Sequence, residues 1–170
     1  MALVDSAAAA PTALARGATI LQLRIPGAPG RTYEKEARVL IPTAFVPVVL
    51  SSRADVALAV GAAGVHLPEA DIPIAAARRL LGAGRLVGRS VHSLEGAVEA
   101  AGAGADYLVF GPVYETATHA GLPAAGLDSL REVCRAVRVP VLAIGGVDFD
   151  RAEECVRAGA AGFAAIGAFQ

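Results

Sequence analysis

Short apolar runs alternate with longer Ala-rich segments from one end of the chain to the other. Eight of the runs are rich in strand formers and bounded by Gly, Pro or polar residues, which predicts β-strands. They cover residues 2–4, 19–23, 47–50, 64–67, 86–89, 106–110, 139–144 and 162–166. Most of these runs are apolar at nearly every position, as expected for strands buried on both faces of a parallel sheet.

The segments between the strands predict seven helices. Their expected ranges are 7–16, a short helix from 32, 54–60, 73–81, 94–101, 128–137 and 150–157. Ser93 is placed to cap the helix that starts at Leu94, and Gly17 is placed to end the first helix. No helix is expected after the last strand.

A short motif, Gly-Ala, comes before four of the strands, at Gly17, Gly61, Gly104 and Gly159. A paired strand–helix unit used four times gives a barrel of eight strands and eight helices. We therefore predict a single domain over residues 1–170, a compact (β/α)8 TIM barrel with the final helix missing or truncated. A doubly wound open sheet is the alternative, because 170 residues is short for a barrel. The side left bare by the missing helix predicts a homodimer.

Composition excludes several classes of function. The net charge is −1 and no block of basic residues exists, so no nucleic-acid partner is expected. No apolar run reaches eighteen residues, so no membrane span is expected. The two cysteines lack metal-site spacing and the N-terminus lacks a signal-peptide pattern, which together favour a cytoplasmic protein.

Most polar residues with useful chemistry follow the strands, where a (β/α)8 barrel carries its active site. The candidates for contact with a substrate are Gln22, Arg24, Ser51, Thr116 and Thr118. Gly145-Gly146 and Ile166-Gly167 follow the last two strands and predict a phosphate site, because backbone N–H groups can approach oxygens closely there. A simple turn is the alternative for the glycine pair.

The three histidines have different expected roles. His119 follows the sixth strand and could transfer protons near neutral pH, although a solvated loop histidine is the alternative. His92 follows the fifth strand, where a structural or supporting role is favoured, and His66 is expected to be a hydrogen-bonded residue of the barrel wall. Arg24 could bind an anion or form a salt bridge at the rim. Glu115 and Asp71 are isolated carboxylates, which disfavours a metal site.

Six motifs in consistent order carry a resemblance to a known family: Gln22-Leu23-Arg24, Arg53–Ala59, Gly64–Leu67, Gly88–Glu95, Phe110–Thr116 and Ala143–Val147. Together they resemble the thiamine phosphate synthase/TenI superfamily, over about Leu3 to Ala168. The resemblance implies a (β/α)8 barrel and a small phosphorylated thiazole as substrate.

The synthase branch of that superfamily joins a pyrimidine diphosphate to a thiazole phosphate with Mg²⁺. By resemblance, its metal-binding Asn-Asp pair falls on Ser51-Ser52, and its second metal carboxylate falls on Asp71. Its two diphosphate-binding lysines fall on Pro26 and His119. Each lost charged contact costs about 1.5–3 kcal/mol, so synthase activity is expected to be impaired, and Mg²⁺ would matter only for that reaction, through Asp71.

The TenI branch is a metal-independent thiazole tautomerase, an isomerase, and Gly88–Glu95 is closer to its pattern. In some tautomerases a His directly after Phe-Gly is the proposed base, whereas this chain has Pro112. The resemblance implies phosphate at Thr116–Thr118, Gly145-Gly146 and Ile166-Gly167. We therefore expect a tautomerase without a cofactor, in which His119 relays the proton, Ser90 and His92 assist it, and Arg24 neutralises the substrate carboxylate. An impaired synthase and a non-catalytic thiazole-phosphate-binding protein are the alternatives.

Overall fold

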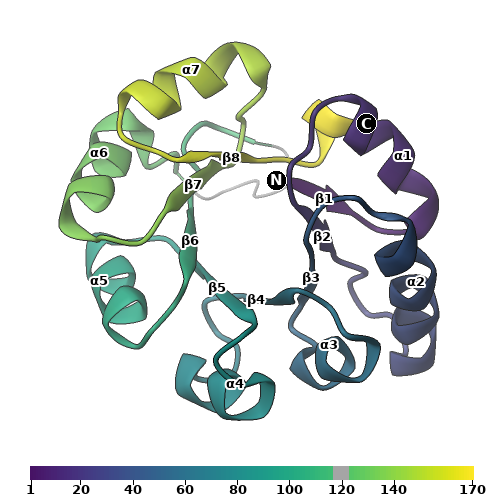
Figure 1. Ribbon diagram of the computed structural model, residues 1–170. Coiled ribbons are helices and arrows are strands. Elements are labelled where there is room, and N and C mark those ends of the chain that lie inside the picture. The colour runs from purple at the N-terminus through teal and green to yellow at the C-terminus, as the bar shows by residue number, and fades with distance from the viewer. Residues whose placement is uncertain (117–122) are drawn as a thin grey trace.

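A computed structural model describes residues 1–116 and 123–170 of the chain (Figure 1). Within these residues, eight parallel strands are hydrogen-bonded in the order of the sequence. They are β1 (Ala2–Val4), β2 (Leu21–Leu23), β3 (Val48–Ser51), β4 (Gly64–Leu67), β5 (Leu86–Val91), β6 (Tyr107–Phe110), β7 (Val141–Ile144) and β8 (Gly162–Ala164).

The sheet closes between its first and last strands. Ala2 pairs with Ala165 in a parallel bridge, and the N–H of Leu3 donates to the carbonyl of Ala165 at 3.0 Å. The (β/α)8 prediction is therefore confirmed, and the open doubly wound sheet is excluded because its strands do not follow sequence order.

In the described part of the chain, seven α-helices surround the barrel (Figure 1). They are α1 (Ala10–Ala15), α2 (Gly30–Thr43), α3 (Ala54–Val60), α4 (Ile74–Leu81), α5 (Leu94–Gly102), α6 (Gly126–Ala136) and α7 (Phe149–Arg157). A 3-10 turn, Ala7–Ala9, precedes α1, and a second one, Gly167–Phe169, is the last element. As predicted, the described residues after β8 hold only this 3-10 turn and no full helix, whereas the homodimer stays a prediction.

Two boundaries differ from the sequence-based expectation in ways that affect the site. Helix α2 starts at Gly30 and runs for 14 residues, so the predicted short helix from Thr32 was wrong in its length. Strand β5 continues to Val91 because Ser90 and Val91 pair with Val109 and Phe110 of β6. Ser90 therefore lies within the barrel wall and not on a loop.

Alternation of side chains along the strands separates two apolar layers. Outward-facing residues such as Leu21, Leu50 and Val65 belong to the large cluster that includes the helices. A smaller cluster, Met1, Val49, Tyr107, Val109 and Ala164, contains inward-facing strand residues and packs with Leu3, Leu142 and Ile144. The inward positions near the carboxyl ends of β2 to β5 carry polar side chains instead: Gln22, Ser51, His66 and Ser90.

Candidate active site

A pocket of about 520 Å³ opens at the carboxyl-terminal end of the barrel, a volume within the usual range for small-molecule sites. Every predicted site residue that the structure describes lines it: Gln22, Arg24, Ser51, Ser90, His92, Thr116, Gly145, Gly146, Ile166 and Gly167. The predicted Thr118 and His119 lie outside the described residues. The sequence-based set therefore comes together in one pocket.

A buried hydrogen-bond network crosses the wall of the pocket. His66 Nε2 lies 2.8 Å from Ser90 Oγ, and His66 Nδ1 lies 3.2 Å from Tyr107 Oη. Burial, with a smaller effect of the Arg89 charge, lowers the pKa of His66 to about 3. A neutral His66 has one ring nitrogen that donates and one that accepts, so both contacts can be satisfied. The expectation that His66 is a hydrogen-bonded wall residue is confirmed.

The depressed pKa of His66 predicts a loss of stability in acid. An unfolded histidine titrates near 6.5, so His66 favours the unfolded, protonated state as the pH falls below that value. With a folded pKa of about 3, this residue alone is expected to remove about 2 kcal/mol of unfolding free energy between pH 8 and pH 5. Urea titrations at both pH values test this in the parent and in His66→Gln. An equal drop in both proteins would contradict the prediction.

His92 has the geometry of a proton-transfer group. Its Nδ1 is hydrogen-bonded to the carbonyl oxygen of Gly111, which can only accept, so Nδ1 carries the hydrogen. In the neutral ring the lone pair is then on Nε2, 3.9 Å from the Glu69 carboxylate. The side chain is 43% exposed and lines the pocket. The structure thus favours a more direct role for His92 than the supporting one preferred from sequence.

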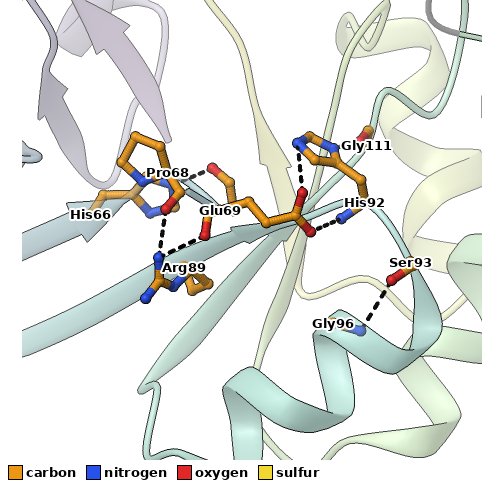
Figure 2. Close-up of polar contacts among 9 residues, drawn as sticks. His66, Pro68, Glu69, Arg89, His92, Ser93, Gly96 and Gly111 are labelled. Carbon is orange, nitrogen blue, oxygen red and sulfur yellow. Dashed lines mark hydrogen bonds and ion pairs between the residues drawn. The ribbon is translucent and has the colours of Figure 1, made fainter. Parts of the chain in front are cut away.

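Glu69 and Arg89 belong to this arrangement and were missed from sequence. Figure 2 shows the Glu69 carboxylate between the ring and the backbone N–H of His92, which donates to Oε1 at 3.4 Å. Arg89 is buried in β5 and donates to the carbonyls of Pro68 at 2.6 Å, Glu69 at 3.2 Å and Ile72 at 2.7 Å. Arg89 therefore fixes the loop that holds Glu69 beside His92. The sequence feature that could have indicated this role is Arg89 itself, a charged residue inside a mostly apolar strand.

The carbonyl oxygens of residues 144–146, at the end of β7 and in the loop after it, accept hydrogen bonds from the protein. The oxygens of Ile144 and Gly145 accept from the N–H groups of Val113 at 2.8 Å and Tyr114 at 3.0 Å. The Gly146 oxygen accepts from Arg151 Nη1 at 2.7 Å. Because a trans peptide points its C=O and N–H in opposite directions, the N–H groups of Gly145, Gly146 and Val147 face the other way.

The same loop has the form of an anion-binding nest. Gly145 and Gly146 have φ values of 89° and 65°, and a Cβ at Gly146 would lie 2.6 Å from the carbonyl oxygen of Glu115. Within residues 1–116 and 123–170, no hydrogen bond uses the N–H of Gly146 or Val147. Successive N–H groups left free beside a pocket are suited to phosphate oxygens. This geometry supports the predicted phosphate site.

The described residues do not fit an Mg²⁺ site. Asp71 does not line the pocket, and its Oδ1 accepts from the N–H of Ile72 at 2.7 Å. Ser51 and Ser52 offer only neutral hydroxyls where Mg²⁺ favours carboxylates. No group of three metal-ligating side chains occurs in the described part of the chain, and residues 117–122 contain no Asp or Glu. No step of the chemistry is therefore assigned to a metal.

No helix in the described ranges, 1–116 and 123–170, is long and apolar enough to cross a membrane.

One family model matches almost the whole chain. The thiamine monophosphate synthase family (TMP-TENI) matches residues 3–169. A thiamine-phosphate synthase of Chloroflexus aurantiacus is 44% identical over 160 residues, which are 92% of this chain and 74% of that protein. A thiamine-phosphate synthase of Pyrococcus horikoshii is 43% identical over 159 residues, covering 92% and 76%. The solved thiamine phosphate pyrophosphorylase of Pyrococcus furiosus superposes with a TM-score of 0.88 at 36% identity, covering 98% of this chain and 84% of that one. The chain therefore belongs to the thiamine monophosphate synthase family.

Proposed function

We propose that this protein is an enzyme of thiamine biosynthesis that binds a phosphorylated thiazole in the barrel pocket and tautomerises it without a metal ion. Family membership supports the pathway, and the free N–H groups of Gly146 and Val147 support phosphate binding. The observation that carries the reaction is His92, whose Nε2 is left as the basic nitrogen in the pocket.

The proton transfer can be written for the groups in the pocket. His92 Nε2 removes a proton from one carbon of the non-aromatic thiazole and returns a proton to another, so the ring becomes aromatic with no net change in atoms. The imidazolium formed in between is stabilised by the carbonyl of Gly111 and the carboxylate of Glu69. Arg24 lines the same pocket and is placed to neutralise the substrate carboxylate. His119 is the alternative relay.

The synthase reaction is the second candidate, and the names of the relatives favour it. A protein named thiamine-phosphate synthase is 44% identical to this chain. Gln22, Arg24, Ser90 and Thr116 all line the pocket. Against it stand the neutral Ser51-Ser52 pair, the position of Asp71 outside the pocket, and the absence of lysine from every position but Lys35.

Two parallel assays decide between the candidates. One supplies the thiazole phosphate tautomer and follows the ultraviolet band of the aromatic product. The other supplies pyrimidine diphosphate and thiazole phosphate with Mg²⁺ and measures thiamine phosphate. We expect turnover in the first assay and slow or no product in the second. Rapid product in the second assay alone would identify a synthase, and tight thiazole phosphate binding without turnover would identify a binding protein.

A further inference from the structure

Three side chains tie the two loops on the phosphate side of the pocket to helix α7. Arg151, in the first turn of α7, donates to the carbonyl oxygen of Gly146 at 2.7 Å. Its guanidinium carbon lies 4.7 Å from the centre of the Tyr114 ring. Tyr114 in turn donates through Oη to Glu154 Oε2 at 2.8 Å. We call Tyr114, Arg151 and Glu154 the α7 clamp.

The clamp acts on the Gly146–Val147 peptide, whose carbonyl accepts from no backbone N–H of residues 1–116 and 123–170. The carbonyls of Ile144 and Gly145 are fixed by main-chain donors of the loop after β6. The carbonyl of Gly146 accepts instead from a side chain, Arg151. Glycine crosses between backbone conformations with little steric resistance, so this peptide needs an external contact to keep one orientation.

The other contacts of the α7 clamp hold Arg151 in position to donate to the Gly146 carbonyl. Stacking of the guanidinium on the Tyr114 ring restricts the side chain to one position. Burial and the hydrogen bond to Glu154 raise the pKa of Tyr114, so its hydroxyl remains a donor at neutral pH. Asp148 caps α7 by accepting from the N–H of Arg151 at 2.9 Å, which fixes the backbone from which Arg151 extends.

We propose that Arg151 is a positioning residue for phosphate binding: by holding the Gly146 carbonyl on the outer side, it presents the N–H of Val147 to the ligand. Tyr114 and Glu154 support it by fixing the guanidinium. The proposal rests on the phosphate site of the proposed function but not on which reaction follows.

The test compares thiazole phosphate with the matching thiazole alcohol, which lacks the phosphate. Calorimetry gives the affinity of both ligands for the parent protein, Arg151→Met, Arg151→Lys and Tyr114→Phe. The matched control is Arg157→Met, because Arg157 lies on the same helix and pairs only with Glu153 at 2.9 Å within the described residues.

We expect Arg151→Met to weaken thiazole phosphate binding by about tenfold, the effect of misplacing one donor to a charged group. Arg151→Lys keeps a donor for the carbonyl and should recover most of the affinity, and Tyr114→Phe should have a smaller effect. Arg157→Met should bind like the parent. The affinity for the thiazole alcohol should be the same in all of these proteins.

Unchanged phosphate affinity in Arg151→Met would overturn the inference. So would an equal loss for phosphate and alcohol, because that indicates a general distortion of the pocket. A separate measurement of inorganic phosphate binding to the parent protein distinguishes the two proposals. If the parent does not bind phosphate at all, the phosphate site of the proposed function is wrong. If it binds and Arg151→Met binds equally well, only the role of Arg151 is wrong.

Discussion

Replacing His92 by Gln is expected to lower the rate of thiazole tautomerisation by about 100-fold or more, the usual contribution of a general acid–base group. Gln can still donate to the carbonyl of Gly111, but it has no nitrogen that takes up a proton. The affinity for thiazole phosphate should change little, because the proposed phosphate contacts lie on the loop after β7. Stopped-flow absorbance measures the rate, and calorimetry measures the affinity.

His119→Gln is the matched variant for this prediction, since His119 is the other candidate for the relay. We expect His119→Gln to keep most of the turnover. Glu69→Gln should fall between the two, because it removes the charge that faces the His92 ring at 3.9 Å but leaves the ring in place. Full turnover in His92→Gln together with a large loss in His119→Gln would reverse the assignment.

Gly88→Ala is expected to destabilise the protein by about 3 kcal/mol, at the upper end of the cost of overfilling a core. A Cβ at Gly88 would lie 2.1 Å from Cζ of Tyr107, whose ring is buried inside the barrel. That ring cannot swing away without losing its contact with His66, which in turn contacts Ser90 in the pocket wall. Chemical denaturation measures the loss.

A second substitution checks the cause of this effect. Tyr107→Val removes the ring that the new methyl group would meet, so Gly88→Ala should cost much less in a Tyr107→Val background. Equal costs in both backgrounds would show that the clash with Tyr107 is not the reason. Gly84→Ala is the neutral control, because a Cβ there meets no atom within 4 Å.

Much of the fold is visible in the sequence because parallel strands of a barrel are buried on both faces. The predicted bounds of strand β4 and helix α3 are the same as those in the structure. Ser93 caps its helix as expected, accepting from the N–H of Gly96 at 3.0 Å. The ends of strands are harder to predict from sequence. Ser90 belongs to β5 because it pairs with the neighbouring strand β6, and its own segment does not indicate this.

The pocket residues were predictable because a (β/α)8 barrel places all the loops that follow its strands at one end of the barrel. Contacts between loops were not predictable in the same way. Glu69 reaches His92, and Arg151 reaches Gly146, only once the barrel has closed. No spacing in the sequence indicates either contact. The roles of Thr118 and His119, the cytoplasmic location and the homodimer remain predictions.

We expect a phosphate-anchored thiazole to undergo proton transfer in this pocket without a metal. The decisive measurement is the initial rate of aromatisation, followed by absorbance, in protein dialysed against EDTA and then with added Mg²⁺. We expect equal rates under both conditions, and much slower turnover of the substrate that lacks its phosphate. No turnover in EDTA with full recovery in Mg²⁺, or equal turnover of both substrates, would contradict it.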